Sequence, residues 1–197
     1  MSKKLLLFLT SLIIFSANYS FAEDNTLEQQ KREIIAVYNS NNIKETYNMI
    51  SKITAEERDA ELWLLLANLS QDLNKEDDAI TFLQKAISIN PEYDKAHYNL
   101  ANIYLSKNKL NMAIEEYKLA IKYKKDFAFY HYNLGYTYLL QKNYNKAVSS
   151  LKKAIELKKD EPSFYYNISI AYDALDKKEK SEEAYATYMS IVKEEDL

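Results

Sequence analysis

The sequence predicts an all-α protein, built as a solenoid of repeated helix pairs, and three observations support this. Residues of the same kind recur every 34 positions through most of the chain, a period that indicates stacked repeats rather than one globular core. Within each repeat, apolar residues follow the i, i+3, i+4, i+7 spacing of one helical face. No segment alternates apolar and polar residues for long enough to indicate a β-strand.

Seven columns of residues carry the period of 34. They are Trp63, His97, His131 and Tyr165; Leu66, Leu100, Leu134 and Ile168; Ala67, Ala101, Gly135 and Ser169; Ser70, Tyr104, Tyr138 and Tyr172; Ala79, Ala113, Ala147 and Ser181; Leu83, Tyr117, Leu151 and Tyr185; and Ala86, Ala120, Ala154 and Tyr188. Alanine at a contact lets two helices approach closely, and a large neighbour fills the remaining space. The first four columns predict one helix and the last three predict a second.

This pattern resembles the tetratricopeptide repeat (TPR) family, whose unit is two antiparallel helices. The resemblance rests on bulky–x–x–Leu–small–x–x–Tyr in the first helix and Ala–x–x–x–Leu/Tyr–x–x–Ala in the second. It covers roughly residues 60–190 and implies a right-handed α-solenoid. Pro91 closes the first clear unit as the family's pattern expects, whereas Lys125 and Lys159 stand at the equivalent places of the later units.

Residues 1–22 are predicted to be a secretory signal peptide. Two lysines precede the apolar run 5–15, and the segment Ser20–Ala22 offers small residues at both positions that a signal peptidase reads. The alternative is an uncleaved membrane anchor, but eleven apolar residues are fewer than the ~20 that a spanning helix needs. We therefore expect cleavage before Glu23 and export, to the periplasm or the outside if the source is bacterial, with no membrane span afterwards.

The remaining chain divides into five predicted elements along one continuous array. They are a degenerate N-terminal hairpin and cap at 23–59, clear repeats at 60–93, 94–127 and 128–161, and a C-terminal repeat and cap at 162–197. Each hairpin is apolar on two sides and needs neighbours to cover it, so terminal repeats are usually atypical. The last repeat is the weaker one because Ser181 and Tyr188 replace two expected alanines.

Local signals place the helix ends and the tightest contacts. Asparagines at 74, 108 and 143 lie where the helices must reverse, while Asp94 and Pro162 supply helix-start chemistry. Ala113 and Ala147 are expected at tight helix–helix contacts. Ala128, at the start of a first helix, is expected to be more exposed.

Composition excludes several classes of function. Without Lys3 and Lys4 the chain keeps 24 basic and 29 acidic residues, a net charge of −5, whereas nucleic-acid binding favours a basic stripe. The absence of cysteine excludes disulfides, thiolate metal sites and a lipid-modified cysteine. A single glycine leaves no glycine-rich phosphate loop. We expect no cofactor and no nucleic-acid partner.

No group of residues indicates catalysis. The two histidines, His97 and His131, share a column with tryptophan and tyrosine and are predicted to be half-buried packing residues. A two-histidine metal site is the alternative, but no carboxylate or cysteine is expected on that face. The paired acids Glu115-Glu116 and Glu182-Glu183 are interpreted as solvated faces balanced by lysines. We therefore predict that the protein is not an enzyme.

The predicted interaction surface lies on the first helices, which by the TPR resemblance line a concave groove. The candidate groove residues are Lys95, Tyr98, Asn102, Phe129, Tyr132, Tyr136 and Tyr166. Tyrosine provides rigid amphipathic contact area, and asparagine can pair with an extended backbone. The alternative is that these tyrosines and asparagines only stack neighbouring repeats. Tyr104, Tyr138 and Tyr172 are expected to pack inside the solenoid.

Two functions remain. The first is a scaffold or adaptor that holds a peptide or helix of another cell-envelope protein in the groove. The second is an accessory module of the envelope or of a secretion machine, whose aromatic stripe stacks on glycan. The clamp that some TPR domains use for chaperone tails is excluded, because Phe129, Asn133, Ser163 and Asn167 stand where lysine and arginine are required, and a buried carboxylate would lack its cation.

Overall fold

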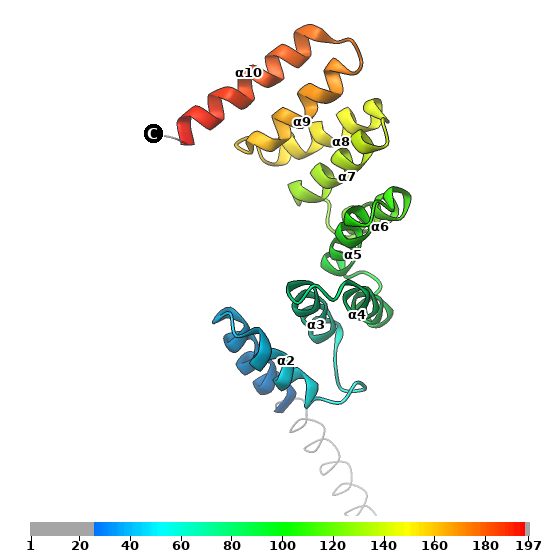
Figure 1. Ribbon diagram of the computed structural model, residues 1–197, viewed down its shortest axis with the longest axis vertical. Coiled ribbons are helices and arrows are strands. Elements are labelled where there is room, and N and C mark those ends of the chain that lie inside the picture. Colours follow the sequence, from blue (N-terminus) through cyan, green and yellow to red (C-terminus); the bar gives the residue numbers. More distant parts are fainter. Residues whose placement is uncertain (1–25, 196–197) are drawn as a thin grey trace, which may run out of the picture. The chain divides into compact units, whose positions relative to one another are not determined.

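The computed structural model describes residues 26–195, which form helices joined by turns and contain no strand (Figure 1). The chain divides into two compact units, Met1–Arg58 and Asp59–Leu197, here called the N-terminal and C-terminal units. The predicted signal peptide, 1–22, lies outside the described residues. The predicted all-α fold is confirmed for the part of the chain that the structure describes.

The described part of the N-terminal unit is a helical hairpin. A helix over 26–39 is followed by α2 (Ile43–Ser51). Ile34 from the first helix and Ile50 from α2 are buried, so the facing sides of the two helices form its core. Thr46 is also buried, and its hydroxyl donates to the carbonyl of Asn42 at 2.8 Å, which satisfies the one polar group of that side chain.

The C-terminal unit is an α-solenoid of four helix pairs. The pairs are α3 (Ala60–Asp72) with α4 (Glu76–Ile89), α5 (Asp94–Ser106) with α6 (Leu110–Tyr123), α7 (Ala128–Leu140) with α8 (Tyr144–Leu157), and α9 (Pro162–Asp173) with α10 (Lys178–Glu195). The second helices α4, α6 and α8 also pack on the first helix of the next pair. We call these three contacts junctions. The column spacing therefore follows from the stacking, because each pair meets the next at the same register.

Each pair reverses through one residue in the left-handed region. Asn74, Asn108, Lys142 and Asp176 have φ of 57°, 56°, 59° and 55°. The amide of the following residue donates to a carbonyl of the first helix's last turn, as Lys109 does to Tyr104 at 2.8 Å. This arrangement closes a helix by satisfying its last carbonyl groups, and asparagine tolerates it better than most residues.

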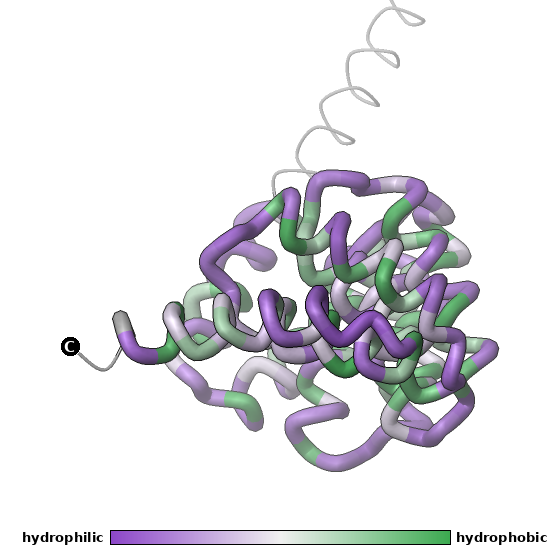
Figure 2. Tube along the Cα trace, turned by 90° about the horizontal axis from the view of Figure 1, so that it is seen from above, coloured by the Kyte–Doolittle hydropathy of each residue, from purple (hydrophilic) through white to green (hydrophobic). Residues whose placement is uncertain are grey.

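The core consists largely of alanine at helix contacts. Ala79, Ala113 and Ala147 have no exposed surface, and neither do the alanines at 86, 120 and 154. Hydrophobic and hydrophilic residues alternate along the helices (Figure 2), as expected where each helix buries a stripe. Ala128 is more exposed than Ala113 and Ala147, as expected, but at 7% it is still buried, because Phe164 of the next first helix packs over it.

At Gly135 the backbone of α7 lies close to Leu151 of α8. A Cβ atom there would lie 2.8 Å from Cγ of Leu151 and 3.2 Å from its backbone nitrogen. These distances are shorter than van der Waals contact, so Leu151 occupies the volume that a side chain would need. The absence of a side chain at Gly135 thus allows α7 and α8 to pack closely at this point.

Candidate functional site

Side-chain hydrogen bonds join neighbouring first helices of the C-terminal unit. An asparagine amide nitrogen is the donor in each: Asn99 to Asn68 Oδ1 (2.8 Å), Asn133 to Asn102 Oδ1 (3.1 Å) and to the Tyr98 hydroxyl (3.0 Å), and Asn167 to the Tyr132 hydroxyl (2.9 Å). We call this set the asparagine ladder. It fixes the first helices side by side, because each rung joins a residue of one repeat to the next.

Tyr98 and Asn102 belong to this ladder and also face the core. Asn102 Oδ1 accepts a second hydrogen bond from the Tyr117 hydroxyl at 2.6 Å. The Tyr98 ring lies 4.8 Å from that of Tyr130, centroid to centroid. Both candidate residues are half-buried, so the polar atoms expected to meet a peptide already have partners within the protein.

Phe129 and Tyr132 form the contact between α7 and α9. The Phe164 ring lies 5.5 Å from the Phe129 ring and 4.8 Å from the Tyr132 ring, with which it is stacked. Burial raises the pKa of the Tyr132 hydroxyl above its usual range. Nζ of Lys158 lies 5.3 Å from the centre of the Phe129 ring. These two aromatic residues hold the repeats together and present only part of their rings.

Lys95, Tyr136 and Tyr166 are the exposed members of the predicted groove. Tyr136 is 36% and Tyr166 is 44% exposed, and Lys95 is exposed at the start of α5. Tyr136 stacks on Tyr132 at 6.4 Å, and Tyr166 packs on Tyr188 of α10 at 5.3 Å. Their role in binding stays a prediction. Tyr138, expected inside the solenoid, is buried.

One further column was missed from the sequence. It consists of the third residue of each first helix, Leu62, Ala96, Tyr130 and Phe164, and all four are buried. The Tyr130 hydroxyl donates to Asp94 Oδ2 at 2.6 Å, and burial with this bond raises its pKa. The period of 34 alone could have revealed the column, but its residues differ in size and chemistry.

His97 has a carboxylate partner, contrary to the expectation from the sequence. Its Nδ1 lies 2.7 Å from Glu116 Oε2, and its Nε2 lies 3.0 Å from the carbonyl oxygen of Pro91. Both neighbours are hydrogen-bond acceptors, so only the doubly protonated, imidazolium form of His97 can donate to both of them. Burial alone would lower the pKa of His97, but these hydrogen bonds and the charges of Glu116 and Asp94 outweigh it and raise the pKa above 6.5.

The position of Glu116 around helix α6 explains why the carboxylate partner of His97 was not expected. Glu115 pairs with Lys118 at 2.8 Å on the solvated side of α6, as the paired-acid interpretation expected. Glu116 lies about 100° further round the helix and points to α5, where His97 is 4% exposed. Two adjacent acids therefore occupy different environments.

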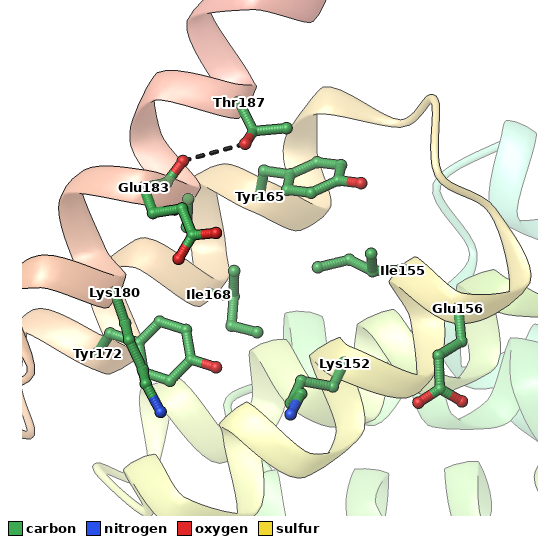
Figure 3. A pocket seen from close by; sticks show the side chains of 10 residues that line it. Lys152, Ile155, Glu156, Tyr165, Ile168, Tyr172, Lys180, Glu183 and Thr187 are labelled. Carbon is green, nitrogen blue, oxygen red and sulfur yellow. Dashed lines mark hydrogen bonds between the residues drawn. The ribbon is translucent and has the colours of Figure 1, made fainter.

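A cavity of about 410 Å³ lies among α8, α9 and α10 (Figure 3). Its lining consists of Lys152, Ile155, Glu156, Tyr165, Ile168, Tyr172, Lys180, Glu183, Ala184 and Thr187. The two lysines and two glutamates balance in charge, and none of the predicted groove residues lines it. The Thr187 hydroxyl donates to the backbone carbonyl of Glu183 at 3.0 Å, so it is already used within α10.

Among residues 26–195, no cluster of three histidine, cysteine, aspartate or glutamate side chains could hold a metal ion. Within the same described range, no helix has both the length and the apolarity needed to cross a membrane.

The repeats match known families over most of the C-terminal unit. Residues 67–107 and 101–142 match the family described as TPR repeat, and residues 128–161 and 162–191 match tetratricopeptide repeat families. Together these matches cover more than half of the chain. The chain therefore belongs to the tetratricopeptide repeat family, as its columns predicted.

Solved structures of MamA share the fold. One crystal structure of MamA is 20% identical and superposes with a TM-score of 0.75, covering 81% of this chain and 94% of that one. MamA from residue 41 to the end, from Desulfovibrio magneticus RS-1, is 16% identical with a TM-score of 0.77, covering 86% and 97%. No curated protein sequence matches significantly. At these identities the likeness shows the fold alone.

Proposed function

We propose that this protein is a non-enzymatic scaffold or adaptor that binds a peptide or helix of a partner protein on its first helices. Membership of the TPR family supports a role in protein interaction. The observation that carries the proposal is the contrast on this surface between the asparagine ladder, which fixes the helices, and the exposed Lys95 and Tyr136. A surface held rigid before binding loses little entropy when a partner docks.

The ladder favours a partner that presents apolar side chains. The amide nitrogens of Asn99, Asn133 and Asn167 already donate within the protein, so they have less capacity to pair with an extended backbone. Exposed aromatic rings instead suit the apolar face of an amphipathic helix, a recurring mode of recognition. We therefore favour a helix over an extended strand as the bound segment.

Site-specific photo-cross-linking in the source cells tests this function. A photoreactive phenylalanine analogue at Tyr136 is expected to give a discrete protein adduct. The same analogue at Met112, which is 45% exposed on the second helix α6, is the control. Equal adducts at both positions would contradict binding on the first helices, and a protease-resistant adduct at Tyr136 would indicate a glycan ligand instead.

We also propose that the protein is exported and works in the cell envelope. The support is the sequence of residues 1–22, with its lysines, short apolar run and small residues before Glu23. Mass spectrometry of the protein from cells is expected to find Glu23 at the N-terminus. Intact Met1 in a membrane fraction would indicate an anchor.

A further inference from the structure

The cavity among α8, α9 and α10 lies where one register of the second helices carries a small residue (Figure 3). In the first pair Phe82 occupies this register and packs on Trp63, with the ring centres 5.5 Å apart. In the second pair Glu116 occupies it. Ala184 stands there in the last pair, and it lines the cavity together with Tyr165. A methyl group in place of a larger side chain leaves space beside the Tyr165 ring.

The middle of this cavity is apolar. Ile168 from α9 is buried and Ile155 from α8 is half-buried, and Figure 3 shows both between the Tyr165 ring and the end of Lys152. The volume of about 410 Å³ falls within the range of roughly 300–1,000 Å³ of small-molecule sites, which combine apolar walls with a few polar groups. The cavity therefore has the size and the walls to hold the hydrocarbon part of a small molecule.

Two lysines and a tyrosine hydroxyl line one end of the cavity. Figure 3 shows the side chains of Lys152 and Lys180 directed toward the end where the Tyr172 hydroxyl lies. Among residues 26–195, no carboxylate forms an ion pair with either lysine, and the Tyr172 hydroxyl has no hydrogen-bond partner. Three donors that the protein itself does not use therefore belong to this end.

The preceding junction shows why Lys152 lacks an acidic partner. Lys118 of α6 stands at the same register. Its Nζ lies 2.8 Å from Oε1 of Glu115, three residues earlier. Ser149 stands at the register of Glu115, so the equivalent ion pair cannot form in α8. The charge of Lys152 is therefore available to an anion from outside the protein.

Two glutamates also line the cavity but do not neutralise its lysines. Oε2 of Glu156 lies 2.9 Å from Nζ of Lys153, which is outside the lining, so Glu156 already has a cation. Glu183 forms no ion pair among residues 26–195, and Figure 3 shows its carboxylate on the opposite side of Ile168 from Lys152. Of the lining residues without an ion pair, two are lysines and one is a glutamate, so the cavity has an excess of positive charge.

We propose that this cavity binds a small organic carboxylate with an apolar body, such as the anion of a medium-chain fatty acid. The carboxylate accepts hydrogen bonds from Lys152, Lys180 and the Tyr172 hydroxyl, and bonds between ionised groups are the strong ones. The hydrocarbon chain covers Ile155 and Ile168, which removes apolar surface from water. None of the predicted groove residues takes part, so the site is independent of the proposed scaffold function.

Octanoate and octylamine are matched probes, because they share one hydrocarbon chain and differ in the sign of the charge. In backbone NMR spectra of the full chain, octanoate is expected to shift the signals of α8, α9 and α10 saturably. Its affinity should exceed that of octylamine by at least about fivefold. Equal affinities, or shifts confined to other helices, would overturn the proposal.

Ser149→Glu tests the role of Lys152 without altering the cavity wall. The new glutamate gives Lys152 the partner that Lys118 has at the preceding junction. It is therefore expected to weaken octanoate binding by about two- to fivefold. Ser149 is exposed, so the fold tolerates this change, which circular dichroism verifies.

Replacing both lysines locates the anion. Lys152→Met with Lys180→Met is expected to weaken octanoate binding by about five- to tenfold and to leave octylamine binding no weaker. Lys118→Met with Lys146→Met, at the same registers of the preceding junction, is the matched control and should leave octanoate binding unchanged. Octanoate affinity that survives the first double replacement, or that falls equally in the control, would show that these lysines do not hold the carboxylate.

Discussion

In the pair α5–α6, His97 bridges Glu116 and the carbonyl of Pro91. In the next pair, α7–α8, His131 keeps the contact with a loop carbonyl, that of Lys125 at 2.8 Å. Ser150 stands at the register of Glu116. The shared contact joins each histidine to the carbonyl six residues earlier, so the column fastens the loop between pairs. Of these two pairs, only α5–α6 adds a carboxylate, that of Glu116, to the histidine.

The two pairs also differ in the contacts of their predicted groove residues, Asn102 and Tyr136. In α5–α6 the Tyr117 hydroxyl reaches Asn102 at 2.6 Å, which ties the groove residue to the second helix. In α7–α8 the equivalent residues are Leu151 and Tyr136. Leucine has no hydroxyl to donate, so no equivalent hydrogen bond connects α8 to Tyr136, and Tyr136 is exposed. The exposure of a residue in the predicted groove therefore depends on the side chain that the second helix places behind it, and Tyr136 on α7 is more exposed than Asn102 on α5.

Replacing the two histidines tests the first difference. His97→Ala leaves the Glu116 carboxylate without its buried hydrogen-bond partner, so we expect the free energy of unfolding to fall by about 2–4 kcal/mol, less than for a wholly buried pair because Glu116 is 22% exposed. His131→Ala removes one hydrogen bond and should lower it by about 1 kcal/mol. Urea unfolding of both variants measures this, and equal losses would show that the carboxylate adds nothing.

The pH dependence of stability sharpens the same comparison. Because the pKa of His97 is raised in the folded protein, its stabilising contribution is fully present below pH 6.5, the usual histidine pKa, and is lost as pH rises through the folded pKa. Glu116→Gln should remove this loss, whereas His131→Ala should retain it. Melting curves between about pH 5 and 9 test this. An unchanged profile in Glu116→Gln would contradict the pairing.

Substitutions at the groove register test the second difference. Asn102→Ala removes the acceptor of both the Tyr117 hydroxyl and the Asn133 amide, so we expect a loss of about 1–3 kcal/mol in unfolding free energy. Tyr136→Ala should change it by less than about 0.5 kcal/mol, as for an exposed side chain. Denaturant midpoints distinguish the two, and a large loss for Tyr136→Ala would place that ring in the core rather than on a binding surface.

The fold could be predicted because stacking repeats the same contact at each junction. The same kind of neighbour contacts Leu151, Tyr117 and the alanines of the second helices in successive repeats. Similar side chains are therefore required at the same position of each repeat, and this requirement appears as a period in the sequence. Helix type and pairing follow from this period. The period does not predict how far Ala128 is buried, because Phe164, which packs on it, belongs to the next repeat.

The candidate surface was less predictable for a related reason. A period shows which residues share a register, but the partners of a polar atom depend on two registers at once. Asn102 lies between Tyr117 and Asn133, and His97 lies between Glu116 and Pro91. Neither the Tyr117–Asn102 hydrogen bond nor the His97–Glu116 pair recurs in α7–α8, so the columns contain no trace of them. A polar interaction that occurs only once in a protein leaves no period in the sequence, so it is found only from the three-dimensional structure.

A further prediction concerns the turns of the same two pairs. Asn108 and Lys142 adopt φ of 56° and 59°, and lysine lacks the short polar side chain that lets asparagine tolerate this region. Lys142→Asn should therefore raise the unfolding free energy by about 0.5–1 kcal/mol, and Asn108→Lys should lower it by a similar amount. Both residues are exposed, so few contacts confound the exchange. Urea midpoints that shift in the same direction for both variants would show that side-chain contacts, rather than backbone conformation, determine the residue at these turns.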